Sequence, residues 1–438
     1  MKRAHIDELN ITRALAILAV LLIHSTSTPV TALSSESKLY SIYVFFNIFP
    51  KFAVPVFIFL SGFVLFYNYI QKDFTKKLIV CFYKKRVTQI LIPYLFFSVF
   101  YFAAMQFYVT RDFSLAWHAL FSVEFLQKLL IGKAYTHLYY IFIMVQFYLM
   151  FPLFLYILKK KPALSPLLIW TGLALQWIFI LLNAEYWQYP YRGSISFSYI
   201  LYFLAGGFLG VYFEKYKRWF QLTQKNFPIS IYFIWAIWLF STIYNIYLYY
   251  FVYSSSTYLA NSIVFELVFQ LQSLTACIVL LQLSFWIFNR GNKAFVNALI
   301  NLGTLSFGIY LLHPFFLFLY RQIPVSGNSL LFHVWSVGGF IVALFITWIV
   351  VFLVGKYFKY HWIAFGQIPK EFPYKKMLPL IIVETILTNK KALWKLFHRA
   401  FFNDRLNYFE IEPSFTLLLL ASTRFVALNS TTMLSVKA

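Results

Sequence analysis

The chain has 438 residues, of which 61% are hydrophobic and only 12% are charged. So few charged groups cannot give a folded chain of this size a water-soluble surface, which excludes the ordinary soluble enzymes and binding modules. The charges are also unbalanced, with 37 Lys and Arg against 14 Asp and Glu and a formal net charge of +23. These numbers indicate a basic integral membrane protein.

Apolar runs of suitable length recur along the chain, because about 20 residues suffice for a helix to cross a hydrocarbon core of about 30 Å. An open sheet would leave backbone amides unpaired in lipid, so we expect an all-α, polytopic bundle. The runs predict ten spans, near residues 9–28, 52–70, 87–109, 137–158, 164–182, 196–213, 228–252, 259–288, 299–320 and 331–355.

Lysine and arginine collect in every second connection between the expected spans. The positive-inside rule makes these connections cytoplasmic, and with an even number of spans both termini are then cytoplasmic as well. Because the basic residues are scattered over several connections, we expect the lipid bilayer as a partner and no nucleic acid. The residues concerned are Lys72, Lys76, Lys77, Lys84, Lys85, Arg86, Lys159, Lys160, Lys161, Lys215, Lys217, Arg218, Lys225, Arg290, Lys293, Lys356 and Lys359.

No linker rich in Gly, Ser or Pro divides residues 1–358, which we expect to form one membrane domain. The tail, residues 359–438, has a different character. Its apolar stretches are too short to span comfortably, and KKALWKLFHRAFF has the pattern of a basic amphipathic surface helix. We expect a cytoplasmic tail and assign it no function.

The first expected span carries two ionisable residues, Arg13 and His24, eleven positions apart. Eleven steps of about 100° return a helix to within about 20° of its starting direction, so both side chains share one face, about 16 Å apart along the axis. Ionisable residues inside membrane spans are costly and are more often functional than incidental, which favours chemistry across the membrane. The plainer alternatives are a snorkelling anchor for Arg13 and a hydrogen-bonded interfacial histidine for His24.

Three further ionisable residues are expected in the outer half of the bundle. His137 opens the fourth span, His313 lies late in the ninth, and Glu266 is the one carboxylate expected inside a span. Glu266 is a candidate partner for a protonated histidine, although each of the three also suits a packing role. The sequence holds no set of residues with metal-ligand spacing, so we expect no metal.

A basic cluster, Lys84, Lys85 and Arg86, precedes the third span on the expected cytoplasmic side. Such residues commonly enforce topology, and they also suit the phosphates of a nucleotide carrier. Ser61, beside Gly62 in the second span, indicates close helix packing rather than a nucleophile. The sequence contains no GxSxG, Walker or HExxH motif, which argues against hydrolytic, ATP-driven and zinc chemistry.

Five segments resemble membrane acyltransferase family 3, and they occur in the family's order: IDELNITRALAILAVLLIH, FAVPVFIFLSGFVLF, KKRVTQILIPY, HLYYIFIMVQFYLMFPL and LGTLSFGIYLLHP. The likeness covers about residues 5–355. It implies a ten-helix domain that moves an acyl group, with acetyl the first expectation, from cytoplasmic acyl-CoA to a hydroxyl of a cell-surface or lipid-linked glycan. The family includes O-acyltransferases of bacterial surface polysaccharides. The resemblance thus implies a bacterial plasma membrane, with polysaccharide-synthesis machinery as a candidate partner.

The resemblance also assigns roles to residues. Arg13 and His24 match the family's first-helix pair and are implied as catalytic. Lys84 and Arg86 match its basic pair before the third span, with lysine where arginine is common, and together with Lys85 they are implied as donor-binding. His313 falls in the late S-x-x-x-Y-x-x-H stretch and, like His137 and Glu266, is an additional candidate.

We expect the basic pair and Arg13 to hold the CoA phosphates while the pantetheine arm threads the bundle toward His24. A neutral His24 then takes the proton of the attacking hydroxyl, with an acyl-histidine intermediate as the competing route. Two other classes stay open: a glycan exporter or flippase without covalent chemistry, and a structural subunit of a polysaccharide-synthesis complex. Consumption of acetyl-CoA would separate them from an acyltransferase. Candidate acceptor contacts in the outer loop 183–195 are Glu185, Trp187 and Arg192.

Overall fold

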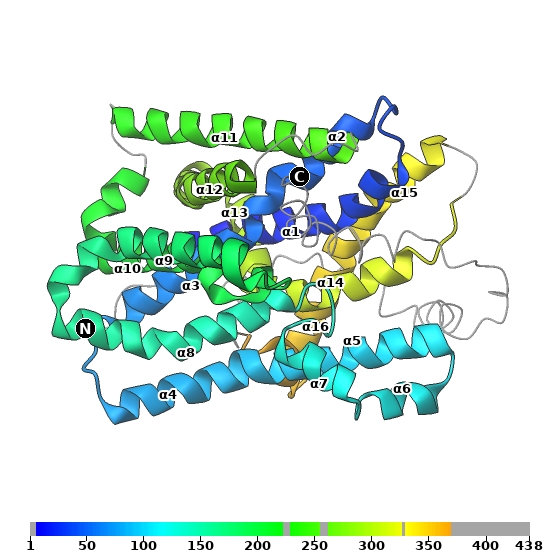
Figure 1. The fold of residues 1–438 in the computed structure, drawn as a ribbon, viewed down its shortest axis with the longest axis horizontal. Coiled ribbons are helices and arrows are strands. Elements are labelled where there is room, and N and C mark those ends of the chain that lie inside the picture. Colours follow the sequence, from blue (N-terminus) through cyan, green and yellow to red (C-terminus); the bar gives the residue numbers. More distant parts are fainter. Residues whose placement is uncertain (1–5, 222–227, 255–261, 326–328, 369–438) are drawn as a thin grey trace, which may run out of the picture.

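The computed structural model describes residues 6–221, 228–254, 262–325 and 329–368. Over these ranges the chain forms helices and connections and no strand. A helix satisfies its backbone hydrogen bonds within its own segment, which is what an apolar chain requires in lipid. The all-α prediction is confirmed. Most of the long helices run along the long axis of the molecule (Figure 1).

Nine helical segments in the described part are long and apolar enough to cross a membrane. A bent pair, α13 (Lys293–Thr304) and α14 (Ser306–Tyr320), is the tenth if it counts as one span. Together they follow the ten predicted spans in order. The helices of the nine segments are α1 (Glu8–Ala32), α2 (Tyr40–Ile48) with α3 (Ala53–Tyr69), α4 (Lys76–Arg86) with α5 (Ile92–Thr110), α8 (Tyr139–Lys160), α9 (Leu168–Leu182), α10 (Ile200–Phe220), α11 (Ile229–Ser254), α12 (Ser262–Arg290), and α15 (Ser329–Ile341) with α16 (Thr347–Tyr357).

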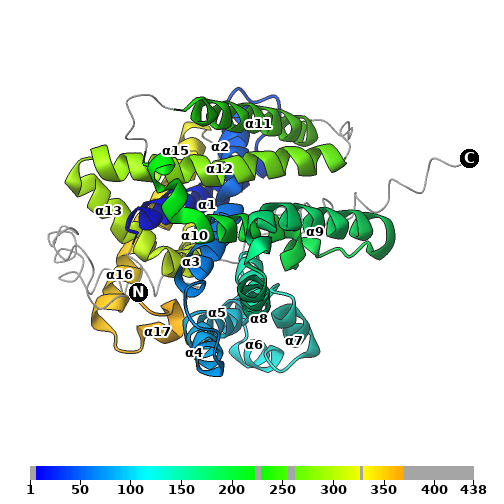
Figure 2. The same cartoon turned by 90° about the vertical axis from the view of Figure 1, so that its left-hand side faces the viewer.

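Helices α1, α3 and α10 form the centre of the bundle. Seen from the side, α11 and α12 lie above them, α9 lies to one side, and α4, α5 and α8 lie below (Figure 2). The short helices α6 (Phe113–Ala119) and α7 (Val123–Leu130) follow α5 at one end of the molecule. This arrangement surrounds α1, which carries Arg13 and His24, with other helices.

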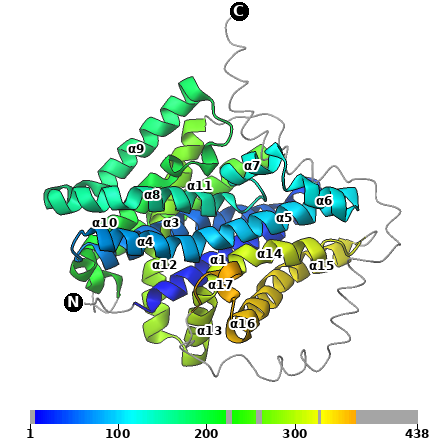
Figure 3. The ribbon, with the colours of Figure 1, turned by 90° about the horizontal axis from the view of Figure 1, so that it is seen from below.

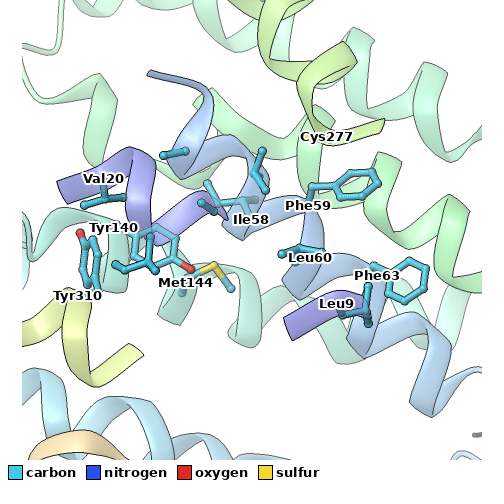
Figure 4. Close-up of a cluster of buried hydrophobic side chains, with 14 of the residues drawn as sticks. Leu9, Val20, Ile58, Phe59, Leu60, Phe63, Tyr140, Met144, Cys277 and Tyr310 are labelled. Atoms are coloured by element: carbon cyan, nitrogen blue, oxygen red, sulfur yellow. The ribbon is translucent and has the colours of Figure 1, made fainter. Parts of the chain in front are cut away.

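Glycines bring α3 and α10 into backbone contact. Gly62 on α3 lies against the backbone of Phe203, and Gly206 and Gly210 on α10 lie against the backbones of Phe59 and Phe63. Phe59 and Phe63 appear along α3 in Figure 4. Small residues four apart allow close helix packing in a bilayer, where burial of apolar surface supplies little drive for helices to associate.

We expect Gly206→Val to lose most of the folded protein, because a Cβ at this position would overlap the carbonyl oxygen of Phe59. Overpacking of this kind typically costs about 1–3 kcal/mol or more. Gly193→Val is the matched control, since its Cβ would meet only the hydroxyl of Tyr199, at 3.8 Å. Melting temperatures of the detergent-solubilised proteins check this, and equal values for the two variants would contradict it.

The predicted ninth span is broken rather than continuous. Helices α13 and α14 meet at an angle of 76°, with Leu305 between them. Gly303, near the end of α13, lies against the backbone carbonyl of Asn10, so α13 packs directly on the start of α1. The apolar run does not reveal this bend, because it depends on packing against another helix.

The ends of the helices define two ends of the bundle. Lys159 Nζ donates to the Ile70 carbonyl at 2.8 Å, which places the end of α8 beside the end of α3. This basic end, with the start of α4 and the end of α10, lies at the left of Figure 1, and α6 and α15 reach the right. At that opposite end, Tyr43 and His333 form a 2.9 Å hydrogen bond. The cytoplasmic placement of the basic end stays a prediction.

The first residues of the predicted tail continue the packed structure. Helix α17 (His361–Phe365) lies beside α16, α14 and α5 (Figure 3), and Phe365 is buried. The remainder, residues 369–438, lies outside the described residues, and so does the predicted amphipathic surface helix.

Candidate active site

Arg13 and His24 both face α14. Helix α1 is continuous over both positions, so the spacing of eleven residues keeps them on one face. Arg13 lines a cavity together with Ser306 and Tyr310 of α14. The ring of His24 lies 5.1 Å from the ring of His313, between centroids. The shared face predicted from the spacing is present in the structure.

Three histidines predicted in the same half of the bundle lie together. The rings of His137 and His313 are 5.8 Å apart, and His313 in turn contacts His24. His137 and His313 are buried, whereas His24 is half-buried. We call His24, His137 and His313 the histidine cluster. It joins α1, α14 and the connection that precedes α8.

The hydrogen bonds of His313 determine its tautomer. Its Nδ1 lies 3.1 Å from the carbonyl oxygen of Ile309. Because a carbonyl can only accept, Nδ1 carries the proton, and Nε2 of the neutral ring is left as an acceptor. This Nε2 is buried and has no hydrogen-bond partner among the described residues. A buried acceptor without a donor is costly, which favours a site that receives an N–H or O–H group from a ligand.

The hydroxyl of Tyr101 forms hydrogen bonds to the backbone of α14 on both sides of Pro314. Proline cannot donate a backbone hydrogen bond and its ring crowds the preceding turn, so helices commonly kink there. Tyr101 of α5 donates its hydroxyl to the Leu311 carbonyl at 2.8 Å and accepts from the Phe315 N–H at 3.2 Å. Its ring stacks on Tyr135 at 4.4 Å. These contacts fix the position of the turn of α14 that carries His313.

Arg321 was not singled out by the sequence, although it binds α1 directly. It follows α14, and its Nη2 donates to the backbone carbonyl of His24 at 2.6 Å. Burial lowers the pKa of Arg321 to about 10, so the guanidinium stays charged at neutral pH. A signal was present in the sequence, since residues 306, 310, 313 and 321 recur at helical spacing.

The Arg13 cavity has a volume of about 180 Å³ and ends at Tyr310. Arg13 Nη1 donates to Asn10 Oδ1 at 2.7 Å. Tyr140 and Tyr310 lie side by side, with Met144 on the far side of Tyr140 (Figure 4), and their ring centroids are 5.2 Å apart. The Tyr310 ring also lies 5.3 Å from His137 and 6.0 Å from His313. Tyr310 therefore stands between this cavity and the histidine cluster. The cavity is lined by Arg13, Phe57, Leu60, Ser61, Ile90, Tyr140, Ile141, Met144, Tyr148, Ser306, Phe307 and Tyr310.

A second cavity, which we call the bend cavity, has a volume of about 450 Å³. It lies at the junction of α13 and α14 and shares Ile90 and Phe307 with the Arg13 cavity. The two cavities are thus adjacent, and Tyr310 lines the Arg13 cavity. The bend cavity is lined by Gln89, Ile90, Thr304, Leu305, Phe307, Gly308, Phe365, Gln367 and Ile368.

The predicted basic cluster divides in two. Arg86 turns toward the bundle, with its guanidinium 4.9 Å from the ring of Tyr148, which lines the Arg13 cavity. Lys84 and Lys85 are exposed at the end of α4. Only the arginine touches a wall of the cavity, and the two lysines extend away from it.

Glu266 does not contact the histidines. Its carboxylate forms an ion pair with Arg192, and both side chains are partly exposed. In a half-buried setting, a nearby cation stabilises a carboxylate more strongly than a neutral imidazole does. Glu185 and Trp187, the other candidate acceptor contacts, are exposed. The predicted pairing of Glu266 with a histidine is therefore replaced by one with Arg192.

The histidine cluster is not a metal-ligand set. In the described part of the chain, no three His, Cys, Asp or Glu side chains are grouped so as to hold a metal ion. The cluster offers instead neighbouring imidazole nitrogens, those of the half-buried His24 among them, an arrangement that suits proton transfer.

One comparison with known proteins returned a match. The family model described as an acyltransferase domain matches residues 6–352. This range contains the histidine cluster, Arg321 and the whole lining of the Arg13 cavity, together with the lining of the bend cavity as far as Gly308. No curated protein and no solved structure matches the chain. Because the family model covers most of the chain, the protein belongs to membrane acyltransferase family 3 and is an acyltransferase enzyme.

Proposed function

We propose that the protein transfers an acyl group, with acetyl the first expectation, from cytoplasmic acyl-CoA to a hydroxyl of a cell-surface or lipid-linked glycan. The observation that carries this proposal is a pair of adjacent cavities, one of which is lined by Tyr310, whose ring contacts the histidine cluster. A thioester placed beside Tyr310 would lie one tyrosine ring away from His24 and His313. Donor and acceptor could therefore meet inside the membrane from opposite ends.

The donor's charged half suits the basic cluster at the end of α4. Guanidinium and ammonium groups bind phosphate oxygens, and Arg86, Lys84 and Lys85 are grouped where α4 ends. Arg13 lies deeper, in a cavity lined mainly by aromatic and apolar side chains. There we assign it, instead of to the phosphates, to the carbonyl oxygen of the thioester, which gains negative charge as the hydroxyl attacks.

The acyl-transfer step accounts for each bond and for the transferred proton with groups in this site and the two substrates. The acceptor oxygen attacks the thioester carbonyl carbon while His24 takes the hydroxyl proton; the C–S bond then breaks, and the proton passes to the departing sulfur to give the free thiol of CoA. The ring of His313 lies 5.1 Å from that of His24, and its unpartnered Nε2 can accept a hydrogen bond that orients the His24 ring. The competing route acylates His24 first and then transfers the group to the acceptor.

The positive-inside rule supports a cytoplasmic basic end and a plasma membrane location with both termini inside. The opposite end, which carries the Arg192–Glu266 pair, then faces the acceptor. We assign the acceptor to the glycans of the bacterial cell envelope, with polysaccharide-synthesis machinery as a partner.

Sealed inside-out membrane vesicles test this function. Acetyl-labelled acetyl-CoA added outside reaches only the former cytoplasmic face, and we expect alkali-labile label to appear on glycan inside vesicles that contain the protein. An exporter or flippase would move glycan without consuming acetyl-CoA. Glycan transport together with no protein-dependent release of CoA would overturn the proposed function.

Arg86→Ala is expected to raise the KM for acetyl-CoA about 10-fold, because loss of a charged hydrogen bond typically costs about 1.5 kcal/mol or more. Lys85→Ala is the matched control and should change the KM only about 2-fold, since an exposed charge is screened by salt and solvent. Initial rates in membranes at several acetyl-CoA concentrations provide the measurement. A larger effect for Lys85→Ala would contradict the inward role of Arg86.

A further inference from the structure

We infer that the bend cavity binds the pantetheine arm of the donor, and that the segment after the last span, residues 361–368, forms one wall of this site. The inference rests on the proposed function and deepens it, because it assigns a place to the uncharged half of acyl-CoA. The matched family range ends at residue 352, so this wall lies beyond it.

The break between α13 and α14 shapes the space. Because the chain turns by 76° at Leu305, α14 does not continue the line of α13. Thr304 and Gly308 line the cavity from the two sides of this bend. The opposite side is formed by Gln89 and Ile90 of the π-helical turn η2 (Val87–Leu91), which joins α4 to α5.

The third side is the segment after α16. Phe365 of α17 is buried, and its ring lies 6.1 Å from that of Phe97 on α5. The next residue, Gly366, has a φ of +65°, and a Cβ there would overlap the carbonyl oxygen of Gln89. Both the left-handed backbone and the close approach require glycine. The backbone of this segment therefore packs directly on η2 at Gly366.

Gln89 and Gln367 meet at the mouth of the cavity. Gln89 Nε2 donates to Gln367 Oε1, and Gln367 is exposed whereas Gln89 is half-buried. Each amide retains further donor and acceptor capacity beyond this one bond. A ligand that carries amide groups can therefore bond to both side chains by small rotations of either one.

The lining matches the arm of CoA better than its nucleotide. The side chains around the bend cavity include two amides and one threonine hydroxyl, the rest are apolar, and among the described residues none of the lining is charged. The pantetheine arm is an uncharged chain with two amide groups and a geminal dimethyl group. The nucleotide carries phosphates, which need cations such as Arg86. The volume of about 450 Å³ lies within the usual range of small-molecule sites.

The course of the donor follows from the shared walls. Ile90 and Phe307 border both cavities, so we direct the sulfur end of an arm in the bend cavity toward the Arg13 cavity. The nucleotide then remains outside both cavities, at the basic cluster where α4 ends. The acyl group arrives beside Tyr310, next to the histidine cluster.

Two ligands separate the arm from the nucleotide in a binding experiment. CoA contains both, and adenosine 3′,5′-bisphosphate contains the nucleoside, the 3′-phosphate and the first of the two 5′-phosphates, without the arm. Calorimetry on the full-length, detergent-solubilised protein should show that Gln367→Ala raises the Kd for CoA about 5-fold, the usual effect of one lost neutral hydrogen bond. The Kd for adenosine 3′,5′-bisphosphate should not change.

A second variant fills the cavity. Thr304→Trp places a large ring in the bend cavity and should raise the Kd for CoA more than 10-fold, again without effect on the bisphosphate. Gln322→Ala is the control, because Gln322 follows α14 at its far end and bonds there to Phe318 and Tyr108. This variant should bind both ligands as the unmodified protein does.

An unchanged Kd for CoA in both cavity variants, or equal weakening of both ligands, would overturn the assignment of the arm. The proposed function fails differently, namely if the unmodified protein neither binds CoA nor transfers label from acetyl-CoA. Normal acyl transfer together with unaltered CoA binding by Gln367→Ala and Thr304→Trp would remove this inference alone.

Discussion

His24→Ala is expected to lower the rate of acyl transfer by about 100- to 10,000-fold, the range that positioned general acid–base groups contribute. The imidazole of His24 is half-buried, lies 5.1 Å from that of His313, and is the least buried member of the histidine cluster. Alanine removes the only side chain of α1 next to His313 that could take the proton of the acceptor. Acetyl transfer in membranes, normalised to the amount of folded protein, provides the measurement.

The matched control for this variant is His118→Ala, which removes an exposed histidine on α6. It should retain the full rate. If His24→Ala kept the rate of the unmodified protein at an equal melting temperature, His24 would have no part in the chemistry, and both the general-base route and the acyl-histidine route would fall.

Arg13→Met is expected to lower kcat/KM about 10- to 100-fold, because a charged hydrogen bond is typically worth about 1.5–3 kcal/mol. Methionine keeps much of the length and apolar stem of arginine but loses the cation, so the cavity stays filled while its positive charge is lost. Arg13→Lys should recover part of the rate through its ammonium group. The donor dependence of the initial rate measures both variants.

Arg111→Met serves as the control for charge removal, since Arg111 lies exposed at the end of α5. We expect it to leave kcat/KM unchanged. An equal loss of activity in Arg111→Met and Arg13→Met would indicate a general effect of charge on the protein rather than a role for the Arg13 cavity.

Much of the fold follows from the sequence because lipid leaves a chain few choices. An apolar run of sufficient length must be helical, so the spans appear in the predicted order. The common face of Arg13 and His24 follows for the same reason, since α1 has no break between them. Of the additional candidates, His313 lies beside His24, and His137 lies beside His313.

What the sequence could not predict depends on contacts between distant segments. The run 299–320 is uniformly apolar, yet it bends because Gly303 rests on the backbone of Asn10, nearly three hundred residues earlier. Glu266 finds Arg192 instead of a histidine for a similar reason. Local patterns contain no information on which of two possible partners the fold brings closer.

Tyr101 and Tyr310 show the same limit at the site. A chain with 33 tyrosines gives no reason to select two of them. The structure selects them because one bridges the break at Pro314 and the other separates the Arg13 cavity from the histidines. The wall formed by Gly366 and Gln367 was likewise hidden, because it lies in what reads as the start of a tail.

An experimental structure of the full-length protein with a thioether analogue of acetyl-CoA, which cannot transfer its acyl group, tests the central claim most directly. We predict that the sulfur lies in the Arg13 cavity beside Tyr310, within one ring of the histidine cluster, and that the arm passes between Gln89 and Thr304. A donor bound elsewhere, or a bundle closed between Arg13 and His24 with the analogue present, would contradict the account.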